Sequence, residues 1–556
     1  GAINARYMGA QNSVVDKVNA KQHWVAQCAS RTNEDLIVKF FNNSEEASNW
    51  LIDKCEALGG SAMVGAFYSH DDVYAEQPGY HMFMIPEEAG LTSTGFAGAE
   101  LCYLDAVKDG AEFVFDSPAV QLVKDDSGKV CGCICETSEG YVQYNAAKGV
   151  VLATDDIGGS PGMCEAYAPI CAEYGQPRSQ YTPAGVNTGD GHKMGLWVGA
   201  HMQDGPFPLM LHPQACSMFH GCFPFVNQEG HRFMNEGTWV QGKSMNVMHQ
   251  TGNVAWSIFD ADYGKYNRMS LESGTGGGMF WDTMSAAIGQ EFTDDDVTSI
   301  VESDITVGNT VKADSIEELA ALIGAPADVL QETIDRYNEL VTKGADDDFH
   351  KPADFLYPVV KAPFYAAKVG VAMLAVVGGL SVNTDLQVLD DEKKPIEGLY
   401  ATGNTSGDLY AIDYPINMAG NSNGRCVIWG YLLGKTMAKA TASGEALTSR
   451  DELADLAKDE NGIVASDTVY KDGSYTGTGQ GRGGDMEVTV TITDGKISDI
   501  VVNSHAESSD IGAPALDKLI QNAIAANSAE IDGASGATMT SDGFREAVAQ
   551  ALAKAQ

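Results

Sequence analysis

Two short stretches of the chain, far apart in sequence, share one pattern. Lys148–Asp156 reads "KGVVLATDD", and Glu397–Gly407 reads "EGLYATGNTSG". In each, a short apolar run leads to Ala-Thr and a turn of small or polar residues, which is typical of a central strand of an α/β fold whose C-terminal end meets a ligand. We therefore expect these two strand ends, about 250 residues apart, to face one large ligand.

The composition excludes several classes of protein. A net charge of −41 over 556 residues argues against nucleic-acid binding, because phosphate contacts need clusters of Lys and Arg. No apolar run reaches the length of about 18 residues that spans a bilayer. The eleven cysteines are scattered without C-x-x-C spacing, so no metal site is expected. Cys131, Cys133 and Cys135 alternate as on one face of a strand, where cysteine acts as a small hydrophobe.

The chain length predicts more than one domain. The pattern changes from a mixed α/β region to a less regular insertion, returns to a strand-rich region, and then passes through a polar connector to a small α+β domain. The expected boundaries are 1–215, 216–355, 356–440, 441–468 and 469–556.

The last of these domains has the clearest local pattern. Val488, Val490 and Ile492 alternate, and Asp494-Gly495 after them predicts a hairpin. A helix is expected near "PALDKLIQNAIAAN". A final helix should start near Ser541, with one apolar face formed by Phe544, Val548 and Leu552.

Between those two helices lies "DGASGATMTS", Asp532–Ser541. "DGASGAT" resembles the flavinylation motif of FMN-binding domains of the respiratory flavoprotein type, in which a flavin transferase esterifies the last threonine to the FMN phosphate. The resemblance implies covalent FMN on Thr538. Ser535, Gly536 and Ala537 add little bulk around that hydroxyl, and the start of the final helix favours the phosphate because its N–H groups are free.

Residues 1–440 resemble the flavoprotein family of fumarate reductases, urocanate reductases and 3-ketosteroid dehydrogenases. The motifs that carry the resemblance are "GAINA", "KGVVLATDDIGG", "NTGDGHKMG", "EGLYATGN" and "AGNSNGRCVIWGYLLGK". It implies a Rossmann-like FAD-binding domain with an inserted α+β capping domain and non-covalent FAD. The implied FAD-binding positions are Gly1, Ala2, Ile3, Asn4, Ala5, Val120, Ala153, Thr154, Asp155, Gly158, Gly403, Asn404, Gly420, Asn421, Ser422 and Asn423.

The sequence departs from this family at three places. Asp155 and Asp156 replace two glycines, and Asn404 stands where an acidic contact to the ribityl chain is usual. The G-x-G-x-x-G fingerprint with which the family opens after its first strand, and which brings the FAD pyrophosphate to a helix N-terminus, is missing from residues 1–440. Because "GAINA" already matches a later loop, the first βαβ unit is inferred to be absent from this sequence.

The substrate positions depart further. His212 in "LHPQ" matches the substrate-side histidine of the family. The proton-donating arginine corresponds to Val240, a second histidine to Ala375, and the carboxylate-binding arginine to Asn417. Since a guanidinium binds a carboxylate through two parallel hydrogen bonds, these replacements argue against fumarate and other small dianions.

"DYPINMAG" instead resembles the segment of ketosteroid dehydrogenases whose tyrosine polarises the substrate carbonyl, so Tyr414 is the second catalytic candidate beside His212. The alternative for Tyr414 is a core tyrosine with satisfied contacts. Trp239, Tyr410 and Phe223 are candidates for an aromatic wall, or are simply packing residues. His220 and His231 are weaker candidates for the acid and are expected on the surface.

The leading hypothesis is a flavin-dependent reductase of a conjugated C=C bond in an aromatic or bulky enoate or enone. Electrons would pass from covalent FMN to FAD and on to the substrate. The resemblance implies an extracytoplasmic role in anaerobic respiration, with a cytochrome or flavoprotein as donor and a flavin transferase for maturation. The alternatives are a fumarate-like dicarboxylate reductase and an electron-transfer flavoprotein without substrate reduction.

Overall fold

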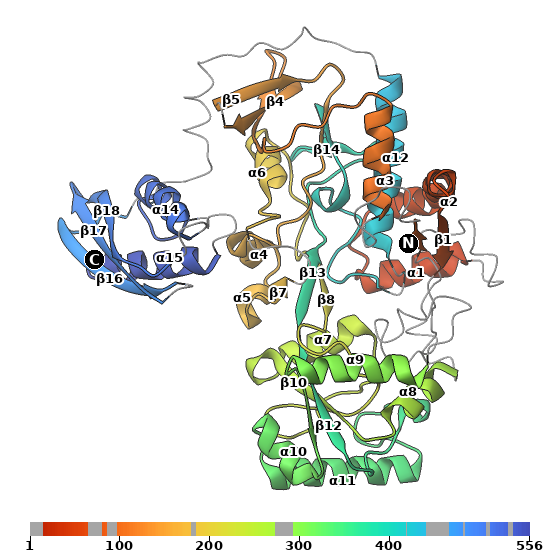
Figure 1. Ribbon diagram of the computed structural model, residues 1–556. Coiled ribbons are helices and arrows are strands. Elements are labelled where there is room, and N and C mark those ends of the chain that lie inside the picture. Colours follow the sequence, from red (N-terminus) through yellow and green to blue (C-terminus); the bar gives the residue numbers. More distant parts are fainter. Residues whose placement is uncertain are drawn as a thin grey trace.

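The computed structural model describes residues 15–64, 81–85, 97–138, 140–179, 185–272, 293–416, 418, 420–440, 466, 468–481, 484–507, 512–531 and 538–555. The expected site residues Gly1–Ala5, Asn417 and Ser535–Ala537 lie outside this part of the chain. Three bodies are visible in Figure 1: a main body, an inserted segment at its lower end, and a C-terminal domain. Among the described residues, no helix combines the length and apolarity of a bilayer span, and no group of His, Cys, Asp and Glu forms a candidate metal site.

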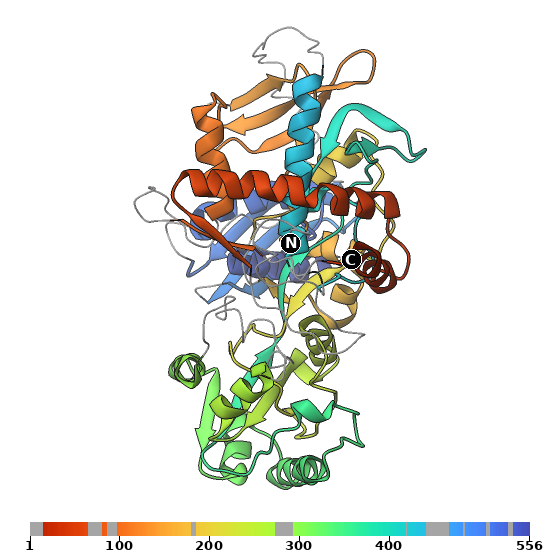
Figure 2. The same ribbon diagram turned by 90° about the vertical axis from the view of Figure 1, so that its right-hand side faces the viewer.

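The main body combines small sheets with helices that cover them, as the two views in Figures 1 and 2 show. Its sheets have the strand orders β1-β2, β3-β4-β5, β14-β15-β6 and β7-β13-β8. The strands are β1 Ser61–Val64, β2 His81–Met84, β3 Ala119–Lys124, β4 Val130–Thr137, β5 Gly140–Asn145, β6 Val150–Leu152, β7 Arg178–Ser179, β8 Leu209–His212, β13 Ala372–Val376, β14 Gln387–Leu389 and β15 Pro395–Ala401. The helices are α1 Lys17–Gln27, α2 Glu34–Ala57, α3 Ala97–Lys108, α4 Pro161–Tyr167, α5 Ile170–Tyr174, α6 Asp190–Trp197 and α12 Asn421–Lys439.

Strands β6 and β15 carry the two matching stretches of sequence. They pair in parallel, with Leu399 opposite Val150 and Ala401 opposite Leu152, so their C-terminal ends lie side by side. The sequence predicted a central strand at Lys148–Asp156, whereas β6 is last in its sheet and pairs only with β15 among the described strands. Val151 on β6 is accordingly 37% exposed.

The inserted segment has its own sheet, of order β11-β12-β10-β9, flanked by helices. Its strands are β9 Phe225–Val226, β10 Val254–Phe259, β11 Thr310–Ala313 and β12 Phe364–Gly370. Its helices are α7 Val240–Met248, α8 Tyr263–Glu272, α9 Asp294–Thr306, α10 Ile316–Ile323 and α11 Ala327–Lys343. Because β12 pairs with β10 and β11, this sheet extends past the boundary expected at residue 355.

The C-terminal domain is an antiparallel sheet of β16 Gly473–Gln480, β17 Asp485–Thr493 and β18 Lys496–Ser504, covered by α14 Gly512–Ala526 and α15 Thr538–Ala553. The predicted alternation on β17 is confirmed, and so is the apolar face of α15, since these side chains share one buried core. Helix α15 begins at Thr538, three residues before the predicted start. Gly477 and Gly479 let α15 approach β16 closely, because a Cβ at either would lie 2.0 Å from a backbone carbonyl of the helix.

Candidate functional site

The ends of β6 and β15 are joined by hydrogen bonds through their side chains. The Thr154 amide donates to Thr405 Oγ1 over 3.1 Å, and Asn404 Nδ2 donates to Asp155 Oδ1 over 2.6 Å. Asp155 adopts a left-handed backbone with φ 62°, a conformation that glycine, Asp and Asn tolerate best. The structure thus brings both predicted strand ends to one place, and the backbone of Asp155 is of the kind that glycine, which the family resemblance implies here, adopts readily.

A buried arginine stabilises this junction from the first turns of α12. Arg425 Nη2 donates to Asn404 Oδ1, and Nη1 donates to the Ser406 carbonyl over 3.3 Å. Its guanidinium lies 4.7 Å from the centre of the Tyr410 ring. The Asn404 amide therefore bridges a carboxylate and a guanidinium, with its NH₂ toward Asp155 and its oxygen toward Arg425.

The remaining positions implied for FAD fall into two groups. Gly403 and Ala153 lie at the same strand ends, and Gly158 donates its amide to Asp156 Oδ1. Gly420 precedes α12, whose first turn carries the other three, Asn421, Ser422 and Asn423. Val120 lies on β3, in a different sheet that contacts α6.

Asp156, the second of the two aspartates that stand where the family resemblance implies glycine, connects the end of β6 to β13. It is buried and also accepts a hydrogen bond from the Val376 amide over 2.8 Å. Burial and the nearby Asp155 raise its pKa to about 6. Asp156 therefore acts as a structural bridge between β6 and the neighbouring sheet.

Several buried polar atoms at this junction make no hydrogen bond with the described residues. They are Thr402 Oγ1, Tyr410 OH, Asn421 Oδ1 and Arg425 Nε. Buried polar groups are normally satisfied, so a cluster of unpaired donors and acceptors fits a polar ligand that reaches between the strand ends and α12. The residues present here fit a flavin cofactor on this ground.

The substrate-side positions lie where α7 contacts β8 and where β8 pairs with β13. Ala372 on β13 lies opposite His212 on β8. Gln241, in the first turn of α7, accepts from the Leu211 amide over 2.8 Å and donates to the Leu209 carbonyl over 2.6 Å. This side chain fixes the start of the helix to β8.

The groups at that meeting point are mostly apolar. Val240 begins α7 and is 4% exposed, and Ala375 lies near the end of β13. His212 is buried, and burial lowers its pKa to about 3, which keeps its imidazole neutral. None of these three groups supplies a positive charge at neutral pH.

Tyr414 lies between the substrate-side and cofactor-side groups. Its hydroxyl accepts a hydrogen bond from the Ser422 amide over 3.1 Å, and its ring is 5.5 Å from that of Tyr410. Burial raises its pKa above the ordinary value, so the phenol stays protonated at neutral pH. The phenol oxygen is an acceptor toward α12, which leaves its O–H to act as a donor.

The three aromatic candidates separate in the structure. Tyr410 stacks on Trp24, 5.4 Å away at an interplanar angle of 11°. Phe223 packs in the aromatic core of the inserted segment, and Tyr410 belongs to the core of the main body. Trp239 is half-buried directly before α7. The rings of Tyr410 and Phe223 therefore pack in different cores, and the three aromatic side chains do not form one wall.

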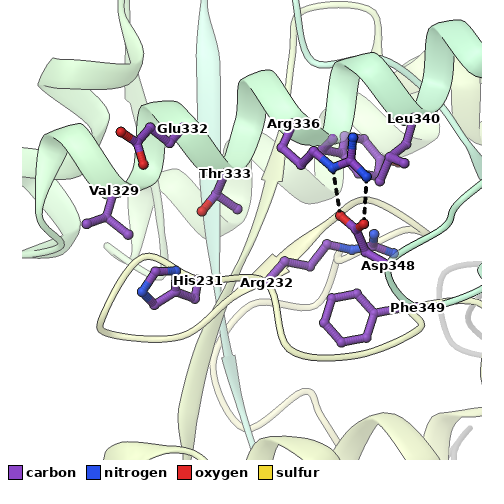
Figure 3. A pocket seen from close by; sticks show the side chains of 10 residues that line it. His231, Arg232, Val329, Glu332, Thr333, Arg336, Leu340, Asp348 and Phe349 are labelled. Carbon is purple, nitrogen blue, oxygen red and sulfur yellow. Dashed lines mark hydrogen bonds and ion pairs between the residues drawn. The ribbon is translucent and has the colours of Figure 1, made fainter.

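The two weaker histidine candidates differ. His220 was expected on the surface, but it is fully buried, and burial together with the Lys243 charge lowers its pKa to about 3. His231 is exposed as predicted, at the rim of a cavity of about 240 Å³ in the inserted segment. Figure 3 shows this cavity, with Arg336 paired to Asp348. His220 is kept neutral by its lowered pKa, and His231 lies at a cavity of the inserted segment. Neither is therefore a candidate acid where α7 contacts β8.

Sequence reasoning missed two groups in this region, Arg425 and Asp413. Arg425 is the one basic residue in the otherwise uncharged stretch Asn421–Leu433, and a charge in such a stretch is a usable signal of a buried partner. Asp413 stands beside Tyr414 and is largely enclosed; burial raises its pKa to about 6. Sequence offered no signal for the enclosure of Asp413, because the covering residues come from α1 and α7.

Comparison with known proteins identifies both parts of the chain. A family described as "FAD binding domain" matches residues 1–417, and one described as "FMN-binding domain" matches residues 481–553.

Individual relatives and one solved structure agree with this. The probable fumarate reductase Ifc3 of Shewanella frigidimarina is 27% identical, over 79% of this chain and 68% of its own length. The vinyl phenol reductase of Lactiplantibacillus plantarum is 24% identical, over 79% of this chain and 87% of its own. An open conformation of a flavocytochrome c3 fumarate reductase has the same fold, with a TM-score of 0.57 and 24% identity, over 79% of this chain and 70% of that one.

Proposed function

The chain belongs to the family of flavoproteins that carry this FAD-binding domain, and we propose that it reduces a conjugated C=C bond in an aromatic or otherwise bulky enoate or enone. When bound, reduced FAD supplies the hydride for such a reaction. The chain's own residues bind and orient the alkene, polarise its activating group and deliver a proton.

The observation that carries this proposal is that Val240, Ala375 and His212, at the positions implied for the substrate, carry no charge at neutral pH. Val240 is aliphatic and 4% exposed at the position where relatives have a proton-donating arginine. His212 beside it is neutral, as its lowered pKa indicates. A small dianion needs paired charge or several hydrogen bonds once it is desolvated, whereas an aromatic or bulky alkene is stabilised by apolar packing.

Tyr414 supports a carbonyl or phenol oxygen as the activating group. Its hydroxyl accepts from the Ser422 amide, so its proton can be donated to the substrate. A neutral donor that is fixed in a dry site stabilises negative charge as it develops on that oxygen.

We further propose that electrons enter through FMN bound covalently to Thr538, attached by a flavin transferase. The match to an FMN-binding domain and the start of α15 at Thr538 support this. A helix N-terminus favours a phosphate group. The electron donor would be a cytochrome or another flavoprotein in an extracytoplasmic respiratory chain.

Two alternatives remain open to test. The relative that is a probable fumarate reductase favours a dicarboxylate reductase in which other basic residues have taken over substrate binding. The replacement of the acid by Val240 favours an electron-transfer flavoprotein that reduces no alkene.

Anaerobic reoxidation distinguishes these functions. The dithionite-reduced protein is mixed with 4-vinylphenol, a hydroxycinnamate, a stilbene, 2-cyclohexenone or fumarate, and flavin absorbance is followed. We expect reoxidation by one of the bulky alkenes. Reoxidation by fumarate alone supports the dicarboxylate reductase, and reoxidation by a cytochrome but by none of the alkenes supports the electron-transfer protein.

The covalent link is tested by intact mass after co-expression with a flavin transferase. The wild-type protein should increase by the mass of one FMN ester, Thr538→Ala should show no increase, and Thr540→Ala, two residues along the same helix, should behave like wild type. An unchanged wild-type mass in a competent host contradicts covalent attachment.

A further inference from the structure

A strained turn stands directly before Tyr414. The Asp413 amide donates to the Ala411 carbonyl over 2.7 Å, which closes a turn of three residues around Ile412. Ile412 has φ 64°, an outlying value for a β-branched side chain, and it is 38% exposed. Backbone strain of this kind costs on the order of 1–3 kcal/mol and gathers at functional sites, so the turn calls for a function.

The turn holds the Asp413 carboxyl group in a defined place. The Tyr414 amide donates to Asp413 Oδ1 over 2.8 Å. The side chains of Gln241 and Gln27 lie near the carboxyl group and lower its pKa, in opposition to burial. Gln27 in turn donates to the Tyr414 carbonyl over 3.3 Å, so α1 clamps the same two residues.

These contacts place Asp413 at the substrate side. Gln241 directly follows Val240 and fixes the start of α7 to the strand that ends in His212. A carboxyl group near Gln241 is therefore close to Val240, which stands at the position that the family resemblance implies for the proton-donating arginine. Asp413 also adjoins Tyr414, whose hydroxyl reaches the cofactor side.

We propose that Asp413 is the proton donor of the alkene reduction, taking over the role that Val240 cannot perform. This inference rests on the proposed function. The alkene accepts a hydride, with its electron pair, at one carbon; the π bond breaks, and the pair left on the neighbouring carbon takes the proton from the Asp413 carboxyl group. Two C–H bonds form. The carboxyl O–H bond and the bond that held the hydride in the reduced flavin break, the flavin is left oxidised by two electrons, and a proton from the solvent restores the Asp413 carboxyl group.

The acidity of Asp413 suits this task. Burial raises its pKa to about 6, while the Tyr414 amide, Gln241 and Gln27 act in the opposite direction. Of the titratable groups that face it, the Cys28 thiol has a pKa raised to about 12, also mainly by burial, and the Tyr414 phenol has a raised pKa. Both stay neutral between pH 5 and 8, so Asp413 is the only one of these three groups that titrates there. General acids work best with a pKa near the operating pH.

The test uses the flavin-loaded full-length protein and the alkene that reoxidises it fastest. Stopped-flow single turnovers are recorded from pH 5 to pH 8 for wild type, Asp413→Asn and Asp413→Glu. The wild-type rate constant should fall as the pH rises through about 6, because the acid form is lost. Asp413→Asn should react about 10²–10⁴-fold more slowly, without this dependence, and Asp413→Glu should recover part of the rate.

Asp408→Asn is the matched control. Asp408 lies on the same segment and also has a pKa raised by burial, but the groups that lower its pKa, Ser381, Lys393 and the Val382 backbone, differ from those near Asp413. It should keep the wild-type pH profile. Alkene binding to the oxidised protein, measured by the shift of the flavin spectrum, should be unchanged in Asp413→Asn, which separates proton delivery from damage to the fold.

The outcomes distinguish the two proposals. If no alkene reoxidises the wild-type protein, the proposed function fails, and the role of Asp413 fails with it. If wild type reacts while Asp413→Asn keeps its rate and pH profile, only the role of Asp413 is overturned. Loss of alkene binding or of the flavin spectrum in both Asp413 variants also overturns it, because Asp413 would then be a structural residue.

Discussion

In the main body, the residues implied to bind the cofactor and those implied to bind the substrate differ in polarity. At the ends of β6 and β15, Asp155, Asn404 and Arg425 form a chain of polar contacts. At the meeting point of α7 and β8, Val240 and Ala375 are aliphatic and His212 is neutral. The difference supports the proposed function, in which a flavin lies against the polar side and the substrate is a bulky alkene in place of a small dianion.

The cofactor side should be the more sensitive of the two to a single change. Arg425→Met removes the hydrogen bonds to Asn404 and to the Ser406 carbonyl in a fully buried place. We expect a loss of roughly 2–3 kcal/mol in the free energy of unfolding and a lower flavin content. Urea denaturation and the flavin-to-protein absorbance ratio measure the two effects.

A surface variant of the same helix is the control. Lys435→Met breaks the exposed pair with Glu46 and should leave the free energy of unfolding nearly unchanged, because solvent screens such a pair. Equal costs for the two variants would contradict a special role of Arg425.

On the substrate side, Val240→Ala should have a smaller effect on stability and a selective effect on binding. Removing two methyl groups from this buried position costs about 1–2 kcal/mol. The dissociation constant of a bulky alkene should rise about tenfold, because the apolar packing of one or two methyl groups in a pocket is worth about 1–3 kcal/mol.

Val247→Ala provides the comparison on the same helix. Val247 is fully buried in the main core, so it should show a similar loss of stability with unchanged alkene binding. Weaker binding in both variants would mean that Val240 acts only through the fold.

Ile412→Gly should produce the smallest change in stability, and in the opposite direction. Glycine adopts φ 64° without strain, so the free energy of unfolding should rise by about 1 kcal/mol while the turn loosens. Single-turnover reduction should slow, because the Asp413 carboxyl group is held less firmly. A variant that is more stable and equally fast would show that the strained turn has no part in the reaction.

Local patterns predicted the C-terminal domain well, because alternation on β17 and helical spacing on α15 are properties of adjacent residues. The matching strand ends were also correctly predicted to come together. The sequence did not reveal that Asn404 binds Asp155, that His220 is buried, or that Gln27 and Gln241 enclose Asp413. These depend on contacts between segments up to several hundred residues apart, for which a single sequence carries no distance information.

The position of β6 in its sheet is a second feature that the sequence alone did not predict. Its apolar run predicted a central strand, yet it pairs on one side only among the described strands, and Val151 is 37% exposed. An apolar run indicates that a strand can be buried. It does not indicate how many strands pair with it, because that depends on the rest of the sheet.

The central claim is that the substrate side selects a bulky, conjugated alkene over a small dianion. The most direct measurement is the single-turnover rate constant for reoxidation of the reduced protein by 4-vinylphenol or a hydroxycinnamate, compared with fumarate at equal concentration. We predict that the aromatic alkene reacts at least about tenfold faster, because its ring packs against an apolar surface and Val240 offers a dianion no positive charge. Faster reoxidation by fumarate would contradict the claim.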